Sequence, residues 1–278
     1  MSCKVGHRGA PRSAADDCYR NVHRLTLRRR ACTAAGRKYS AANRCPLELG
    51  RCFGVAAKSP YTERVPSANT SCVLIPVKAF SQAKLRLSAV LTVEERADLA
   101  RSMAAVVIRS ARPLGAHVVC DDDEVAQFAE SLGATVEWTS EHDLNGAVQQ
   151  AADSLGERGV QRIIVCHADL PFAHDLGALA QAEPSEVLLV SDRPMQGTNV
   201  LSVPAARGFT FSYGPGSFVR HQLQAQLCNL TATVLDCDAL SWDIDEPEDL
   251  QIPSTFLASS PLLVEGRITA AHHPSTVK

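Results

Sequence analysis

Three aspartates lie where predicted β-strands end, and their side chains are suited to hold a divalent metal ion. Asp169 stands in His-Ala-Asp-Leu-Pro, and Asp243 and Asp245 stand in Trp-Asp-Ile-Asp-Glu-Pro-Glu-Asp-Leu. Carboxylates that meet at the carboxyl edge of a parallel sheet offer hard oxygen ligands, which suit Mg²⁺ and its complexes with nucleotide triphosphates. We therefore expect Mg²⁺ at these aspartates and a metal-dependent transfer onto or from a nucleotide.

Each of these aspartates also has a purely structural interpretation. A single Asp after a strand commonly forms a turn or caps a helix, as Asp169 would. Asp245 is in place to cap the short helix that Glu-Pro-Glu-Asp-Leu predicts, with Pro247 in its first turn. Because side chains alternate along an extended segment, Asp243 and Asp245 are expected on the same side, where one can bind metal while the other caps.

Three cations, Lys78, Lys84 and Arg86, follow the first predicted strand closely. A lysine offers a point charge to phosphate oxygens, and an arginine offers a bidentate fork. The segment lacks the glycine-rich run of a P-loop. We expect these three side chains to face the phosphates of a nucleotide and to act in catalysis through their charge. The alternative is an ordinary solvated loop.

A glycine-containing segment further along the chain suggests an anion site. Gly214 and Gly216 permit close approach of the backbone to a ligand, and Ser217 opens a helix whose N-terminus favours a phosphate or carboxylate. His221 lies one turn further on the same helix face, within reach of such a ligand. The alternatives are a plain turn with a helix cap, and a packed or surface histidine.

Asn145 begins another predicted helix, directly after Leu144. An asparagine in this place often caps the helix. It is also suited to read the edge of a nucleotide base, because its amide both donates and accepts hydrogen bonds.

These residues require a sheet to position them, and the chain predicts one from Ser71 onward. Thr92 and Glu95 form a predicted capping box at the start of a helix, and Gly133 fits the end of another. Strands and helices alternate, which indicates a parallel or mostly parallel sheet covered on both faces. The expected strands are 72–77, 116–120, 134–138, 163–166, 186–190, 199–203 and 232–235.

Charge divides the chain of 278 residues, 45% of them hydrophobic, into an arm and a body. Residues 1–70 hold 14 Lys/Arg and 4 Asp/Glu, a net of +10, and residues 71–278 hold 14 and 26, a net of −12, which together give −2. We expect 1–70 to be a basic, disordered leader, 71–252 one catalytic domain, and 253–278 a loosely ordered tail. The leader's alternatives are a transit peptide, a nucleic-acid-binding arm and an artefact of the start site.

The cysteines and the hydropathy bear on the compartment. The chain has ten cysteines, and those of the basic arm lack the Cys-x-x-Cys pair that is typical of a zinc site. Cysteines in predicted strands behave as small buried hydrophobes. We expect a cytoplasmic protein without disulfides. No apolar run reaches the length of a membrane span, so no membrane is expected as a partner.

The ordered set of segments resembles a known family, the guanylyltransferases that make the side chain of the deazaflavin coenzyme of archaea and actinobacteria. They couple GTP to 2-phospholactate, phosphoenolpyruvate or 3-phosphoglycerate and release pyrophosphate. The resemblance covers about Val73 to Leu250 and rests on Ile-Pro-Val-Lys, Ala-Lys-Leu-Arg-Leu, Leu-Asn, Ala-Asp-Leu-Pro, Gly-Thr-Asn, Gly-Pro-Gly-Ser-Phe-x-x-His and Asp-Ile-Asp-Glu-Pro-Glu-Asp-Leu.

The resemblance implies roles for individual residues. Thr198, Gly214 and Ser217 would bind the phosphorylated acid, and the three aspartates would bind Mg²⁺. The cations at 78, 84 and 86 would face the GTP phosphates, with Asn145 near the nucleotide. Asp143 departs from the family, which often has Gly there, and the basic leader has no counterpart in it.

The resemblance also implies a fold and partners. The fold is a single-domain, Rossmann-like nucleotidyltransferase sandwich of three layers, like that of the molybdopterin guanylyltransferases. A downstream transferase would consume the product, a homodimer is left open, and nucleic acid is not expected as a partner. Two alternatives remain: a nucleotidyltransferase for a sugar phosphate or molybdopterin-type acceptor, and a non-catalytic nucleotide-binding module.

Overall fold

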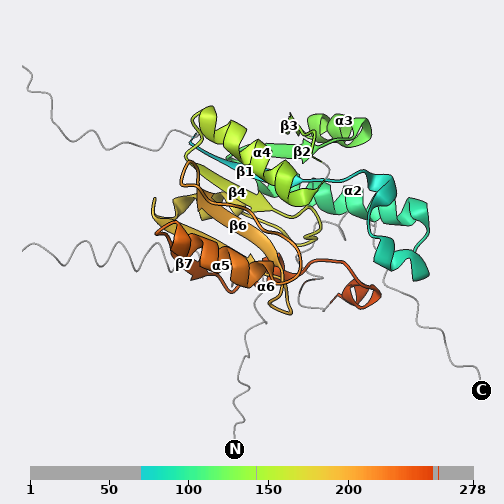
Figure 1. Cartoon of the computed structure of the whole chain (residues 1–278). Coiled ribbons are helices and arrows are strands. Elements are labelled where there is room, and N and C mark those ends of the chain that lie inside the picture. The colour runs from blue at the N-terminus through green and yellow to red at the C-terminus, as the bar shows by residue number, and fades with distance from the viewer. Residues whose placement is uncertain (1–69, 142, 253–255, 257–278) are drawn as a thin grey trace, which may run out of the picture.

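A computed structural model describes residues 70–141, 143–252 and 256 (Figure 1). The predicted leader lies outside the described residues, except for Thr70. The predicted tail also lies outside them, except for Phe256. No helix within the described ranges combines the length and the hydropathy needed to cross a bilayer.

A seven-stranded sheet forms the centre of the fold, in the order β3-β2-β1-β4-β6-β5-β7. β6 runs antiparallel to both of its neighbours, and the other pairings are parallel. The expected mostly parallel α/β fold is therefore confirmed. The strands are β1 (Ser71–Pro76), β2 (Ala116–Cys120), β3 (Thr135–Trp138), β4 (Arg162–Cys166), β5 (Glu186–Ser191), β6 (Thr198–Pro204) and β7 (Thr231–Val234).

Helices cover both faces of the sheet, and α4 and α5 lie on the same side of it (Figure 1). Met103 from α2 and Val125 from α3 pack with Ile75 in one buried cluster. Val148 from α4 and Phe218 from α5 belong to the cluster on the opposite face. The helices are α2 (Val93–Ser110), α3 (Asp123–Ser131), α4 (Leu144–Glu157), α5 (Ser217–Leu227) and α6 (Asp238–Ser241), with 3₁₀ turns η1 (Phe80–Gln82), η2 (Leu85–Ala89), η3 (Leu176–Gln181) and η4 (Pro247–Leu250).

Local signals fix several helix ends as predicted. The side chain of Thr92 accepts from the Glu95 N–H at 3.2 Å, and the Glu95 carboxylate accepts from the Thr92 N–H at 2.8 Å. Gly133 has a φ of +79° just beyond α3, a conformation that glycine adopts without a steric penalty. The capping box and the glycine stop were visible in the sequence because they depend only on neighbouring residues.

The cysteines differ in one respect from the expectation. Cys72, Cys120, Cys166 and Cys228 are free thiols. Cys237 is disulfide-bonded, so the prediction that the chain has no disulfides is wrong at this residue. Burial raises the pKa of Cys72 to about 12, which keeps this thiol protonated and unreactive.

Candidate active site

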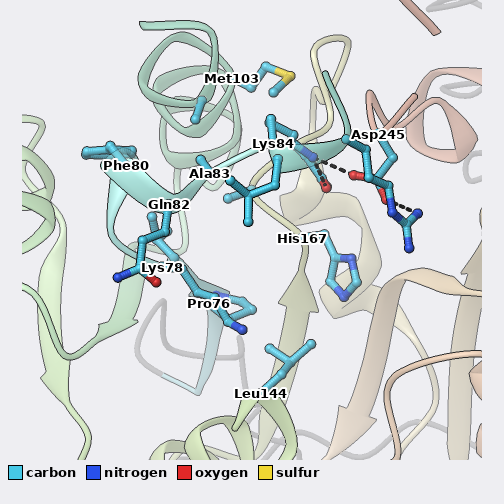
Figure 2. Close-up of a pocket in the computed structure, with 16 residues that line it drawn as sticks. Pro76, Lys78, Phe80, Gln82, Ala83, Lys84, Met103, Leu144, His167 and Asp245 are labelled. Carbon is cyan, nitrogen blue, oxygen red and sulfur yellow. Dashed lines mark hydrogen bonds and ion pairs between the residues drawn. The ribbon is translucent and has the colours of Figure 1, made fainter. Parts of the chain in front are cut away.

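The ammonium group of Lys84 lies between two of the predicted metal ligands. Its Nζ atom is 2.7 Å from Asp169 Oδ2 and 2.7 Å from Asp245 Oδ1. The N–H of Ile244 also donates to the carbonyl of Asp169 at 3.3 Å, which ties the two acidic segments together. We call Lys84, Asp169, Asp243 and Asp245 the carboxylate cluster; Figure 2 shows Lys84 pointing toward Asp245.

Charge, not exposure to water, sets the ionisation of this pair. Burial alone favours the neutral amine of Lys84, but Asp169 and Asp245 outweigh it and hold its pKa above the ordinary value. Burial likewise favours a protonated Asp169, yet Lys84 and then His167 hold the pKa of that carboxyl below its usual range. Lys84 and Asp169 are therefore a charged pair at neutral pH.

Asp243 lies at the edge of this cluster. The amide of Asn199 donates to Asp243 Oδ1 at 3.4 Å and to the carbonyl of Leu240 at 3.1 Å. Burial, followed by the charges of Asp169 and Asp245, raises the pKa of Asp243 to about 6. Asp243 is therefore easier to protonate than an exposed aspartate, first because it is buried and then because two carboxylates lie near it.

The donors of the carboxylate cluster fit a hard cation. Asp169 Oδ1 is buried and has no hydrogen-bond partner among the described residues, which leaves an oxygen available to a ligand. Within those residues, no three His, Cys, Asp or Glu side chains are grouped closely enough to form a metal centre as they stand. Lys84 fills the space between Asp169 and Asp245 instead.

A cavity of about 380 Å³ opens beside the cluster (Figure 2). Lys78, Lys84 and Arg86 all line it, together with Asp169 and Asp245. The sequence-predicted cations are thus brought around one space. They differ in their surroundings: the Lys84 side chain is 10% exposed, whereas that of Arg86 is 69% exposed.

Arg86 reaches the acidic segment from the rim of the cavity, with most of its side chain exposed. Its Nη1 atom is 3.1 Å from Glu246 Oε1 and 4.0 Å from Asp245 Oδ2. Asp245 itself is not the helix cap. Glu246 is the N-cap residue of η4, and Pro247 occupies the first turn as predicted.

Thr198, Gly214, Gly216 and Ser217 come together across the sheet edge from the carboxylate cluster, and we call them the glycine cradle. Ser217 Oγ is 3.3 Å from Thr198 Oγ1, and both side chains are buried. Gly214 and Gly216 have φ values of +108° and +75°, which glycine tolerates and other residues rarely adopt. Gly216 is the N-cap residue of α5, so Ser217 begins the helix but does not cap it.

His221 takes the packed position that was the alternative to contact with a ligand. It is fully buried, and its Nε2 atom accepts from the Ser212 N–H at 3.0 Å. Its Nδ1 atom is 3.0 Å from Thr198 Oγ1, so the ring proton resides on Nδ1 and is donated to that hydroxyl. Both ring nitrogens of His221 thus have partners within the protein. The predicted direct contact with an anionic ligand is replaced by a supporting role, in which the ring orients Thr198. Burial, then Arg220 and His167, lower its pKa to about 4.

A bulge in β6 divides two consecutive residues between the two halves of the site. Val190 pairs with Val200 but Ser191 pairs with Thr198, so Asn199 is the extra residue. Simple alternation from Val200 would place Asn199 on the α5 face and Thr198 on the α6 face. The bulge reverses this, so Thr198 contacts α5 and Asn199 contacts α6 and Asp243.

Asn145 also has a role that its sequence position did not reveal. Its side chain accepts from the N–H of Tyr213 and its Nδ2 atom lies 3.4 Å from the Tyr213 carbonyl. The cap of α4 is Asp143, whose Oδ1 accepts from the N–H groups of Asn145 and Gly146 at 2.9 Å and 3.0 Å. The capping alternative for Asn145 is thus wrong, and its amide braces the glycine cradle.

Three further residues were missed in the sequence. Asp249 accepts from the N–H groups of Asp245 and Glu246 at 2.8 Å each and pairs with Arg193, which fixes the backbone that carries Asp245. The capping box in Glu-Pro-Glu-Asp was the sequence signal for Asp249. The second residue that the sequence analysis missed is Arg220, which contacts the loop of the glycine cradle.

His167 is the third, and no sequence signal distinguishes it. It lines the cavity, and its ring centroid is 5.1 Å from that of Tyr213. Both His167 Nε2 and the Tyr213 hydroxyl are buried without a hydrogen-bond partner among the described residues. Burial lowers the pKa of His167, with opposing contributions from Asp169 and Lys84.

The family model described as "Guanylyl transferase CofC like" matches residues 71–253. The chain belongs to this family. The match covers the whole sheet and every residue of both the carboxylate cluster and the glycine cradle.

Relatives of this CofC-like chain bear related names. A phosphoenolpyruvate guanylyltransferase of Sphaerobacter thermophilus is 33% identical over 189 residues, 66% of this chain and 91% of that protein. One of Roseiflexus castenholzii is 34% identical over 68% of this chain and 88% of its own length. A 2-phospho-L-lactate guanylyltransferase of Methanothermobacter thermautotrophicus is 33% identical over 65% and 82%.

Solved structures support the fold of the CofC-like chain. A nucleotidyl transferase from Methanothermobacter superposes with a TM-score of 0.50 at 14% identity, over 69% of this chain and 100% of that one. A Desulfovibrio desulfuricans protein described as a nucleotide-diphospho-sugar transferase gives a TM-score of 0.55 at 18% identity, over 72% and 97%. These likenesses concern the Rossmann-like sandwich alone.

Proposed function

We propose that the chain transfers GMP from GTP to a phosphorylated three-carbon acid, with release of pyrophosphate. The acceptor is phosphoenolpyruvate, 2-phospholactate or 3-phosphoglycerate. The observation that carries the proposal is the meeting of Lys84 with Asp169 and Asp245 at a cavity that Lys78 and Arg86 also line. In a CofC-like chain, this arrangement suits a triphosphate on one side and the acid on the glycine cradle.

The carboxylate cluster is proposed to hold Mg²⁺ with GTP. Asp169, Asp243 and Asp245 offer oxygen donors, and Asp169 Oδ1 lacks a partner among the described residues. When bound, Mg²⁺ neutralises charge on the phosphates. Lys84, which lines the same cavity, would add a second positive charge beside the phosphate oxygens.

The chemical step requires positioning more than proton transfer. An oxygen of the acid's phosphate attacks the α-phosphorus, its new P–O bond forms, and the bond to the pyrophosphate oxygen breaks. A phosphate monoester has a second pKa of about 6, so the nucleophile is mostly ionised at neutral pH. A general base is therefore not needed. Lys78, Lys84 and Arg86 offset the repulsion between the two phosphorylated substrates.

A product assay tests this function. The protein is incubated with GTP, Mg²⁺ and one of the three acids in each reaction. A sugar phosphate and a molybdopterin-type acceptor are tested in separate reactions as the alternative substrates. The products are identified by mass. GMP joined to one of the acids, lost on chelation of Mg²⁺, is the expected result. Transfer only to the other acceptors would reassign the substrate, and GTP binding without any transfer would leave a non-catalytic nucleotide-binding module.

The setting of the reaction follows from the same proposal. The product joins two phosphates in an anhydride, which is a reactive linkage that a downstream transferase would consume in deazaflavin-coenzyme biosynthesis. A cytoplasmic location is proposed because GTP and the acids are metabolites of that compartment.

A further inference from the structure

Arg220 gathers the carbonyl groups of the loop that carries the glycine cradle. Its Nη2 atom donates to the carbonyls of Ser212 at 2.9 Å, Tyr213 at 3.3 Å and Gly214 at 3.4 Å. Its Nη1 atom donates to the carbonyl of Pro215. Its Nε atom donates to the hydroxyl of Ser212 at 2.7 Å. One guanidinium therefore contacts four consecutive residues.

The glycines of this loop are shaped around the guanidinium. A Cβ atom added to Gly216 would lie 3.3 Å from Arg220 Nη1, and one added to Gly214 would lie 3.9 Å from Nη2. Both glycines also have positive φ angles. Arg220 and the two glycines thus form one structural unit.

Arg220 also changes the electrostatic character of the loop. A carbonyl oxygen repels an anion, and here the carbonyls of residues 212–215 are turned toward a cation. Within the described part of the chain, no hydrogen bond uses the N–H of Gly214 or Gly216. Free N–H groups in a turn with positive φ angles bind anions. The loop therefore offers donors and a nearby positive charge to a ligand.

We propose that Arg220 is a positioning residue for the phosphorylated acid: it holds residues 212–216 so that the N–H groups of Gly214 and Gly216 face the acid. This inference rests on the proposed function of the cradle. Because Arg220 is on the exposed side of α5, its removal would leave the loop carbonyls to water and would not open the core. The expected effect is on acid binding rather than on folding.

The test measures binding of phosphoenolpyruvate by calorimetry to the full chain, to Arg220→Ala and to Arg220→Lys. Arg207→Ala is the matched control, because Arg207 is another exposed arginine and no hydrogen bond or ion pair is formed by it within the described residues. We expect Arg220→Ala to weaken binding of the acid on the order of tenfold or more, since several charge-assisted hydrogen bonds are lost. GTP affinity and the unfolding temperature should change little.

The lysine variant separates positioning from charge. A lysine keeps the cation but lacks the fork that spans several carbonyls, so Arg220→Lys should recover only part of the affinity. Full recovery would show that charge alone matters and would overturn the positioning role, as would unchanged acid affinity in Arg220→Ala. In turnover, the KM for the acid should rise while the KM for GTP stays constant. Wild-type protein that binds the acid without transferring GMP would refute the proposed reaction but leave the role of Arg220 intact.

Discussion

The carboxylate cluster and the glycine cradle lie at the same sheet edge but are held together in different ways. Full charges hold the first: one ammonium group contacts two carboxylates at 2.7 Å each. Hydrogen bonds between side chains and backbone hold the second, with Asn145, His221 and Arg220 as donors or acceptors. The first half therefore depends on a balance of charges, whereas the second is shaped by hydrogen bonds within the protein.

This difference suits the two substrates that we propose. A metal–nucleotide complex brings its own cation, and carboxylates that already bind an ammonium group suit the approach of such a cation. A small acid brings only negative charge and needs donors in fixed places. Variants that act on one half and not the other test this division of roles.

The largest effect is expected from Asp169→Asn. The amide has nearly the same shape but no charge, so Lys84 loses one of its two partners and a metal ion loses a ligand. Pyrophosphate release should fall on the order of a thousandfold while GTP binding is retained. Asp121→Asn, a change at an exposed aspartate that does not line the cavity, should be neutral. Unchanged turnover in Asp169→Asn would remove the carboxylate cluster from the chemistry.

The second effect concerns pH and the cradle. The pKa of His221 is about 4 in the fold against 6.5 ordinarily, so the unfolded chain binds more protons between these values. The stability contributed by neutral His221 is complete above pH 6.5 and is lost as the pH falls toward 4. The loss across this window is on the order of 3 kcal/mol.

Chemical denaturation at several pH values, on wild type and His221→Gln, measures this contribution. The glutamine cannot titrate, so the unfolding free energy of the variant should depend less on pH across that window. Parallel curves for the two proteins would show that the buried ring does not control the acid sensitivity of the cradle.

A smaller effect is expected from Gly216→Ala. The new methyl group would meet the Arg220 guanidinium at 3.3 Å, in a backbone with a φ of +75°. Gly208→Ala is a matched control, because its φ is +68° and nothing lies within 4 Å of the added atom. Both variants should lose about 1 kcal/mol of stability, but only Gly216→Ala should weaken acid binding, by about tenfold. Equal acid binding in the two variants would separate the cradle from the ligand.

The smallest effect is expected from Glu246→Gln. Arg86 and Glu246 form an ion pair at 3.1 Å with side chains 69% and 50% exposed. Exposed pairs contribute less than about 1 kcal/mol, so thermal unfolding should barely change. A large loss of stability would mean that this exposed ion pair is coupled to the carboxylate cluster more strongly than its exposure suggests.

Features that depend on neighbouring residues could be predicted from the sequence. The alternation of strands and helices, the Thr92 capping box and the Gly133 stop all follow from local pattern and were confirmed. The carboxylates and cations of the site could also be named, because Asp, Lys and Arg side chains are ordinarily charged at neutral pH. Their mutual contact, with Lys84 between two carboxylates, depends on strand order and was not predicted.

Features that depend on pairing across the fold were missed. Nothing local distinguishes Asn145 as a brace from Asn145 as a helix cap. The spacing between Ser217 and His221 is the same whether the histidine ring faces a ligand or supports Thr198. Only the burial of the ring in the folded protein distinguishes the two roles. Arg220 looks like an ordinary surface arginine until the loop of residues 212–216 is folded against it.

The extra residue in β6 has a consequence for comparing family members. It sets the faces on which Thr198 and Asn199 are presented, so the same two residues in a strand of regular alternation would exchange the destinations of their side chains. A relative that lacks the insertion must carry the hydroxyl and the amide in the opposite order to build the same site. An alignment that matches positions without allowing for the bulge would assign each residue to the wrong half of the site.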